Sequence, residues 1–313
     1  MLDLKRILWY NFVVRVAELN PYEIEGYNNM LDGKKILFVG NSFTYYGQTV
    51  IEKGVQVLTQ AERGNDKGFF YQLCHEKGIN VSVTNWTFGA HRLSDSLGVC
   101  TANKSCKGTD HISYLVDRNF DYVVLQQGTV TQTSEEFLSI IDAAIAIFKK
   151  ANPHVKFAFL MQYRIHEQMY EWRSAIKELE ARGVTVVDWG ALVWDLITGA
   201  AVVPNTKESY NRNTFIISKS ESDGYHPNML TGYITTLMTY CALTGDSAVG
   251  QPYKFCGDAK INLAFDFEKF KSSFYTYGDS STNFDTVLKS AENIRGIQEL
   301  VDKYLAEKRF LTY

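Results

Sequence analysis

The sequence lacks the features that mark several large classes of protein. Its 32 Lys and Arg are matched by 35 Asp and Glu, the formal net charge is -3, and no run of basic residues occurs. Proteins that bind nucleic acid usually carry a basic stripe, so we expect no nucleic-acid partner. Only 5 prolines are present, and no repeat, low-complexity segment or Pro-rich linker divides the chain. We therefore expect a single domain.

Cysteine is also sparse, and its spacing does not suggest a disulfide framework. The cysteines are odd in number and scattered, at Cys74, Cys100, Cys106, Cys241 and Cys256. Cys74 and Cys241 lie in apolar, helix-like stretches and are expected to be buried thiols. Cys100 and Cys106 bracket a short polar loop, for which free thiols, a local disulfide and a metal site that includes His111 are alternatives.

No apolar run is long enough to cross a membrane. Residues 1–20 carry Lys5 and Arg6 and then apolar residues, but Asn11 and Arg15 interrupt the run and no small-residue cleavage site follows. This pattern predicts an amphipathic N-terminal helix, not a signal peptide, and no membrane partner. The cytoplasm is the default location, although a chain trimmed of its leader would look the same.

Five short β-rich runs alternate with helical patterns. The runs cover residues 35–40, 79–85, 121–127, 155–161 and 184–189, and three of them are almost wholly apolar, as in strands covered on both faces. Helices are expected at 48–60, 68–77, 111–118, 134–151, 167–182, 190–199, 227–243 and 284–308, with an irregular connection at 200–222. The alternation predicts an α/β fold, a three-layer doubly wound sheet of about five parallel strands in flavodoxin-like order, with added terminal helices.

Gly40-Asn41-Ser42 ends the first apolar run. A serine at the carboxyl end of a strand lies where α/β folds place their chemistry, but its hydroxyl needs a base to become a nucleophile. The turn into the helix expected at 48–60 would offer backbone N–H groups and a helix dipole to an oxyanion. The alternative is that Ser42 or Thr44 only caps that helix.

Asp223-Gly224-Tyr225-His226-Pro227 supplies an acid and an imidazole three residues apart. On a turn, the Asp223 carboxylate can hold Nδ1–H of His226 and leave Nε2 for a serine, as triad chemistry requires. A solvated turn and metal ligation are alternatives, although no third ligand is obvious nearby. Together with Ser42, this segment completes the parts of a hydrolytic triad.

These two segments resemble the motifs of the SGNH (GDSL-like) hydrolase superfamily. The fuller strings ILFVGNSFTYYG, DYVVLQQ, DGYHPN and LTGDSAVGQPY are similar to a branch of uncharacterised bacterial SGNH hydrolases. The resemblance covers about residues 34–252. It implies one SGNH-hydrolase-like domain over residues 1–313, with helical extensions at 1–30 and 258–313.

The resemblance implies a role for each matching residue. Ser42 would be the nucleophile, His226 the general base and Asp223 the acid that orients it. The oxyanion hole would use the N–H groups of Ser42 and Gly89. The superfamily's Gly-x-Asn-Asp block is absent, so the amide of Gln127, or else of the preceding glutamine, would replace the asparagine donor.

We expect a serine esterase that works by acyl transfer, without metal or organic cofactor, on a small-molecule or glycan ester. Aromatic residues are abundant, with 19 Tyr, 19 Phe and 5 Trp. Core packing and surface Tyr account for most of such a surplus, although aromatic residues also line sugar-binding clefts. Together with the chemistry common in the superfamily that the chain resembles, they lead us to expect a short acyl group, such as acetate on a carbohydrate. Polar and aromatic residues follow the second and fourth runs, at Trp86, His91, Arg92, Gln162, Tyr163, Arg164 and His166. Of these, Trp86, His91 and Tyr163 are the predicted substrate contacts.

Three alternatives stay open at the level of sequence. A non-catalytic carbohydrate-binding protein on the same fold would follow if the glutamine exchange emptied the oxyanion hole. A metal-dependent hydrolase could use His226, Asp223 and His91. An acyltransferase would pass the acyl group to a sugar hydroxyl in place of water. The sequence does not indicate an oligomeric state.

Overall fold

The computed structural model describes residues 29–41, 43–44, 51–52, 55–56, 69–87, 91–98, 118–204, 210–216, 225–227, 229–253 and 291–313. Several expectations lie outside these residues. They concern the N-terminal helix, the Cys100–Cys106 loop with Cys256, the helix at 111–118 and the site residues Ser42, Gly89 and Asp223. The division into a core and two terminal extensions stays a prediction for the same reason.

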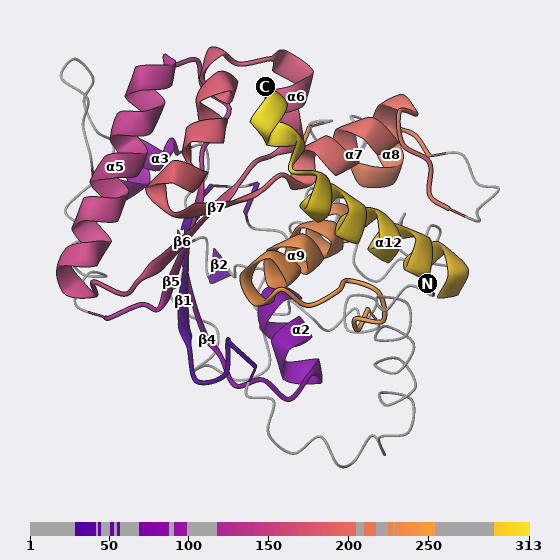
Figure 1. Cartoon of the computed structure of the whole chain (residues 1–313), viewed down its shortest axis with the longest axis horizontal. Helices are drawn as coiled ribbons and strands as arrows, with labels where there is room; N and C mark the ends of the chain where they lie inside the picture. Colours follow the sequence, from indigo (N-terminus) through magenta and orange to yellow (C-terminus); the bar gives the residue numbers. More distant parts are fainter. Residues whose placement is uncertain are drawn as a thin grey trace, which may run out of the picture.

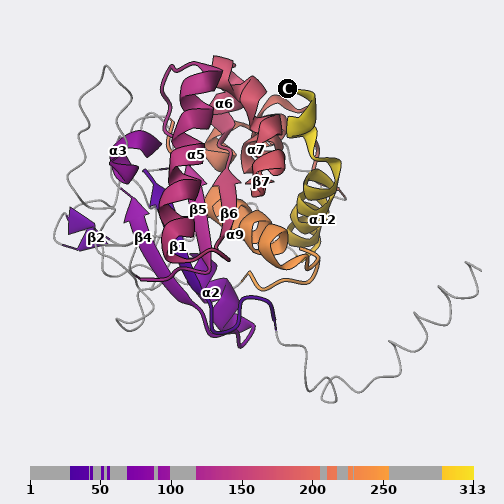
Figure 2. The ribbon, with the colours of Figure 1, turned by 60° about the vertical axis from the view of Figure 1, so that its left-hand side comes forward.

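Five parallel strands form the central sheet, in the order β4-β1-β5-β6-β7 (Figures 1 and 2). They are β1 (Lys35–Gly40), β4 (Ser82–Thr87), β5 (Tyr122–Gln126), β6 (Lys156–Leu160) and β7 (Val184–Val187). Numbered along the chain, this order is 2-1-3-4-5, the flavodoxin-like arrangement. The predicted doubly wound sheet is confirmed.

Alternate residues of the strands feed two separate cores. On β1, Ile36 and Phe38 belong to one core, whereas Leu37 and Val39 belong to the other. The first core contains residues of α2 (Phe69–Glu76), α7 (Trp189–Thr198), α8 (Arg212–Phe215), α9 (Met229–Thr244) and α12 (Ala291–Glu307). The second contains residues of α3 (Leu93–Leu97), α5 (Ser134–Ala151) and the 3-10 helix η1 (Glu171–Glu178). The helices therefore cover both faces of the sheet (Figure 1).

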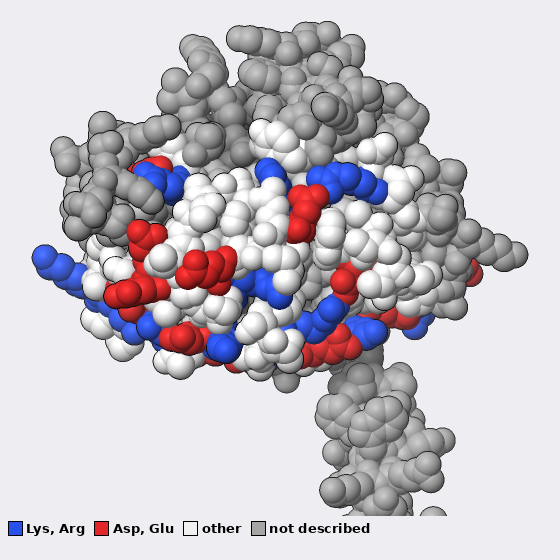
Figure 3. Space-filling model, turned by 90° about the horizontal axis from the view of Figure 1, so that it is seen from above, with Lys and Arg blue, Asp and Glu red and all other residues white. Residues whose placement is uncertain are grey.

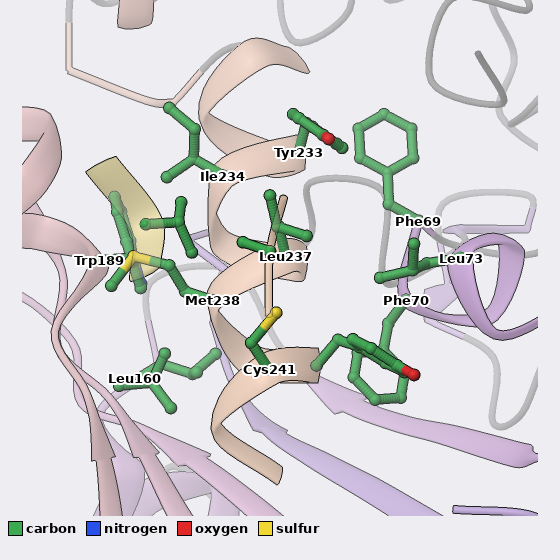
Figure 4. Close-up of a cluster of buried hydrophobic side chains, with 14 of the residues drawn as sticks. Phe69, Phe70, Leu73, Leu160, Trp189, Tyr233, Ile234, Leu237, Met238 and Cys241 are labelled. Atoms are coloured by element: carbon green, nitrogen blue, oxygen red, sulfur yellow. The ribbon is translucent and has the colours of Figure 1, made fainter. Parts of the chain in front are cut away.

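Helix α9 is buried along almost its whole length. In Figure 4 its side chains, among them Tyr233, Leu237 and Cys241, lie among Phe69 and Phe70 of α2 and other apolar groups. A helix that is apolar on all sides belongs in a core. Because α9 begins three residues after His226, that histidine precedes a firmly packed element. Among the described helices, none combines the length and apolar character needed to traverse a bilayer.

Helix α5 begins and ends where the sequence predicts. Its N-cap is Thr133: the Thr133 hydroxyl accepts a hydrogen bond from the Glu136 N–H, and the Glu136 carboxylate accepts one from the Thr133 N–H. This reciprocal pair satisfies two N–H groups at the start of the helix.

The helix expected at 48–60 is wrong where the structure describes that range. Residues Ile51–Glu52 and Val55–Gln56 form two short antiparallel strands, β2 and β3. β-branched residues favour strands, and Ile51 and Val55 are the first residues of β2 and β3. The helix dipole that we expected beside Ser42 therefore loses its support.

Other boundaries also differ. The predicted helix 167–182 is divided: α6 (Tyr163–Gln168) ends at Met169, which has a left-handed φ of 52°, and the 3-10 helices η1 and η2 (Glu180–Arg182) follow. A further 3-10 helix, η4 (Arg309–Thr312), follows α12. Strand β4 begins at Ser82, whereas the sequence run begins at residue 79. Strand β7 stops at Val187 because the Asp188 carboxylate caps α7 through the Ala191 N–H.

Candidate functional site

The loop after β1 is anchored by buried hydrogen bonds from Asn41. The Asn41 backbone N–H donates to Gln126 Oε1 over 3.0 Å, and its side-chain Nδ2 donates to the His91 carbonyl oxygen over 3.0 Å. Asn41 Oδ1 in turn accepts from the Phe43 N–H over 3.0 Å. Asn41 thus connects the loop after β1 to the end of β5 and to the segment after β4, and it also holds Phe43. Loops fixed in this way hold a reacting group better than unsupported ones.

The same loop approaches β5 so closely that only glycine fits at its base. A Cβ on Gly40 would lie 2.3 Å from Thr44 Oγ1 and 2.8 Å from Gln126 Oε1. Thr44 Oγ1 donates to that Gln126 oxygen over 2.9 Å, and the Thr44 N–H donates to the Asn41 carbonyl over 2.8 Å. The Gly-Asn-Ser motif therefore has a steric reason for its glycine and a hydrogen-bonding reason for its asparagine.

The side chain of His226 lies beside this loop. Its imidazole ring is 5.3 Å from the Phe43 ring and 4.4 Å from the Tyr225 ring, measured between centroids, and the residue is 6% exposed. Pro227 forms an isolated β-bridge with Ile216, which secures the segment on its other side. Two segments separated by most of the chain thus converge at the carboxyl edge of the sheet.

Tyr163, at the start of α6, fastens the histidine segment to the sheet. Its hydroxyl donates to the Tyr225 carbonyl oxygen over 2.6 Å and accepts from Arg212 Nη2 over 3.2 Å. Arg212 Nη1 also donates to Glu167 Oε1 over 2.7 Å. Arg164 lies over the Tyr225 ring, with its guanidinium carbon 5.2 Å from the centroid. Arg164 therefore lies against the ring beside His226, and Arg212, paired with Glu167, lies against Tyr163.

The side chain of Gln127 is fully buried and occupied by local hydrogen bonds. Its Oε1 accepts from the N–H groups of Leu93 and Gly128, over 2.8 and 3.0 Å, and its Nε2 donates to Gln132 Oε1 over 2.7 Å. Gln126, the alternative donor, is also buried, and its Nε2 donates to the Gln127 carbonyl. Both carboxamides connect loops, a role that the sequence does not reveal.

The predicted substrate contacts are less exposed to solvent than we expected. Trp86 is 8% exposed, and its Nε1–H donates to the Ser96 carbonyl over 3.0 Å. Tyr163 is fully buried. His91 is half-buried, and its carbonyl accepts the bond from Asn41. Burial of the first two favours structural roles over contact with a ligand.

Among the other strand-end residues, Arg92 and Asp95 form an ion pair, with 3.0 Å between Nη2 and Oδ1. Burial acts to raise the pKa of Asp95, but hydrogen bonds from the Arg92 side chain and N–H outweigh it and leave the pKa below its usual value. The pair forms a capping box at the start of α3, whose first residue, Leu93, holds Gln127.

His166 lies against an acid that the sequence reasoning missed. Its Nε2 is 2.7 Å from Asp188 Oδ1, both residues are buried, and the Tyr313 hydroxyl donates to Asp188 Oδ2 over 2.9 Å. Burial, reinforced by the Asp188 charge, raises the pKa of Tyr313 well above its usual value. Because Asp188 also caps α7, this arrangement serves the junction of β7, α6 and the C-terminal residues.

Sequence reasoning also missed the supporting residues Asn41, Phe43, Glu167 and Arg212. Asn41 and Phe43 flank Ser42 in the motif, so their position was a signal that could have found them. Glu167 and Arg212 are brought together only by folding, from α6 and from α8. No signal in the sequence links them.

The charges of the described residues are mixed in sign. On the face seen in Figure 3, Lys and Arg are interspersed with Asp and Glu, and no broad area of one sign appears on the coloured surface. Within the described part of the chain, no group of three or more His, Cys, Asp or Glu side chains could hold a metal ion.

No family model matches the chain, and the comparison with curated proteins also gives no match. Several solved structures are similar to it. One is Axe2, an acetylxylan esterase from Geobacillus stearothermophilus, with 13% identity, 70% of this chain and 97% of that chain covered, and a TM-score of 0.45. A GDSL-like lipase from Parabacteroides merdae has 14% identity, coverages of 69% and 98%, and a TM-score of 0.45. A Clostridium thermocellum family 3 carbohydrate esterase has 18% identity, coverages of 68% and 99%, and a TM-score of 0.35.

Proposed function

We propose that the protein is a serine esterase of the SGNH type. Ser42 Oγ attacks the carbonyl carbon of an ester while His226 Nε2 accepts the hydroxyl proton, and Asp223 orients the imidazole. The leaving alcohol takes that proton, and the acyl group stays on Ser42. Water then attacks the acyl-enzyme and gives a proton to His226, which passes it to Ser42 Oγ as the Oγ–acyl bond breaks and the freed acid leaves.

The observation that carries this proposal is the contact between the Phe43 and His226 rings, 5.3 Å apart. Phe43 is the residue after Ser42, and consecutive Cα atoms are about 3.8 Å apart. The candidate nucleophile and base therefore belong to segments that touch. A nucleophile and base must come within hydrogen-bond reach, with looser geometry common before substrate binds.

For the oxyanion hole, we propose the backbone N–H groups of Ser42 and Gly89. The hydrogen bonds around Gln127 favour a supporting role for it, since its Nε2 donates to Gln132 Oε1 and the side chain is fully buried. Two backbone donors suffice for an oxyanion hole in other serine hydrolases. Gln127 would then act through the position of the loop that it holds.

Hydrolysis of p-nitrophenyl acetate tests the proposal. Ser42→Ala and His226→Ala should each lower kcat at least about 100-fold, the usual contribution of a general base or more. Ser174→Ala and His154→Ala are matched controls because both residues are exposed, and both should keep wild-type kcat. Activity retained by Ser42→Ala would overturn the esterase assignment.

We further propose a short acyl group, such as acetate on a carbohydrate, as the substrate. This substrate proposal is supported by the aromatic and charged residues around His226. Among them, the Tyr225 side chain is 37% exposed, and such rings commonly contact sugars. A non-catalytic carbohydrate-binding protein is the second candidate, favoured by the occupied carboxamide of Gln127. Glycan binding without turnover of any ester would support that candidate. Transfer of the acyl group to added sugar would identify an acyltransferase.

A further inference from the structure

We propose that Tyr163 is a positioning residue that holds His226 in its working orientation, a role that rests on the proposed function. Tyr163 is not a substrate contact in this account, because the residue is fully buried. Its hydroxyl bonds to the Tyr225 carbonyl oxygen, 2.6 Å away. That carbonyl and the N–H of His226 belong to one peptide group, which is planar. Fixing the carbonyl therefore fixes the peptide plane from which the His226 side chain departs.

Arg212 sets the direction of this hydrogen bond. Guanidinium groups only donate, so Arg212 Nη2 must donate to the Tyr163 oxygen, 3.2 Å away. The Tyr163 hydroxyl proton then points to the Tyr225 carbonyl. Glu167 holds the guanidinium through an Nη1–Oε1 contact of 2.7 Å. The result is a chain of bonds from Glu167 through Arg212 and Tyr163 to the histidine segment.

The ring of Tyr163 also reaches the loop that carries Ser42. Its centroid lies 6.2 Å from that of Phe43, and Phe43 lies 5.3 Å from the His226 ring. The Trp189 ring backs Tyr163 from α7, with 6.5 Å between centroids. Tyr163 thus contacts both halves of the candidate site from an element anchored at the end of β6. A small displacement of a reacting group lowers a rate strongly.

Tyr163→Phe is the direct test, because it removes the hydroxyl and keeps the ring. Tyr240→Phe is a matched control: Tyr240 is also fully buried, and its hydroxyl accepts from Asn29 over 2.9 Å and donates to Asp246 over 2.5 Å. Tyr240 lies in the last turns of α9, remote in sequence from the His226 end of that helix. Both variants should lose a similar amount of thermal stability.

Only Tyr163→Phe should lower kcat for p-nitrophenyl acetate, roughly 10- to 100-fold, with KM unchanged. The loss should vanish when Tyr163→Phe is added to His226→Ala, because a residue that acts through the imidazole has no effect without it. Arg212→Gln, at a partly exposed residue, should also lower kcat, by a smaller factor than Tyr163→Phe. If Tyr163→Phe does not fold, Arg212→Gln tests the positioning role in its place.

Two failures are distinguishable. If Ser42→Ala stays active, the proposed function fails. If Ser42→Ala is inactive while Tyr163→Phe and Arg212→Gln keep wild-type kcat, the esterase stands and the positioning role is refuted. Equal kcat losses in Tyr163→Phe and Tyr240→Phe, or a full further loss in the His226→Ala background, would also refute it.

Discussion

The Phe43 ring packs against the imidazole ring of His226, with their centroids 5.3 Å apart and their planes inclined by 31°. This contact joins the loop after β1 to the segment that precedes α9. Phe43 is itself buried and lies 6.4 Å from the Tyr225 ring. The neighbour of the proposed nucleophile is therefore a packing partner of the proposed base.

Phe43→Leu tests the importance of this contact for activity. Loss of ring contacts in a buried site should lower the free energy of unfolding by about 0.5–3 kcal/mol and lower kcat about 10-fold, because His226 loses the surface against which it packs. Urea unfolding and p-nitrophenyl acetate kinetics measure the two effects. Phe148→Leu, at a buried position of α5 in the other core, should affect stability only. A similar kcat loss in both variants would contradict the prediction.

Asn41→Ala should release the loop that carries Ser42. The variant leaves the Phe43 N–H and the His91 carbonyl without their side-chain partner, and each buried unsatisfied group costs about 1–3 kcal/mol. We expect a lower melting temperature and at least a 10-fold lower kcat. Asn41→Asp is the informative companion because it keeps an acceptor for Phe43 and loses the donor to His91. An unchanged kcat in Asn41→Ala would show that the anchor is dispensable.

The sheet could be predicted from the sequence because its strands are short apolar runs between clear turn signals. The runs at β1, β5 and β6 need burial on both faces, and the structure gives it to them. Residues 51–52 and 55–56 form strands β2 and β3 where the sequence predicts a helix, because a short segment can fit the period of either element. Local pattern thus determines the core strands and leaves the loops between them less certain.

The site could be predicted only in part. The motif residues indicate which segments must meet, and the contact between Phe43 and His226 agrees with that expectation. Ser42, Gly89 and Asp223 stay predictions in their assigned roles. The burial of Trp86 and Tyr163 depends on packing between distant elements, which no local pattern records. The same holds for Gln127, whose partners lie on α3 and in the following loop.

The Arg92–Asp95 pair predicts a specific pH dependence of stability. The pKa of Asp95 is lowered in the folded state, so its stabilising effect is complete above the unfolded pKa of about 4 and is lost as the pH falls through the lower folded pKa. The difference in unfolding free energy between wild type and Asp95→Asn should therefore shrink as the pH falls below about 4. Urea unfolding over this range measures it. A difference that grows on acidification would contradict the shift.

The buried thiols should be inert in the folded protein. Burial raises the pKa of both Cys74 and Cys241 to about 12, and only the thiolate reacts. At pH 8 about one thiol in ten thousand would be ionised, so iodoacetamide should leave both residues unmodified. Peptide mass spectrometry should find them alkylated only after unfolding in guanidinium. Equal alkylation of folded and unfolded protein would contradict their burial.

The most direct test of the central claim is the reaction of the protein with a fluorophosphonate, followed by peptide mass spectrometry. If Ser42 and His226 act together, the adduct forms on Ser42, and His226→Gln slows its formation at least about 100-fold. An adduct on another residue, or equal rates in wild type and His226→Gln, would contradict the pairing of these two segments in one active site.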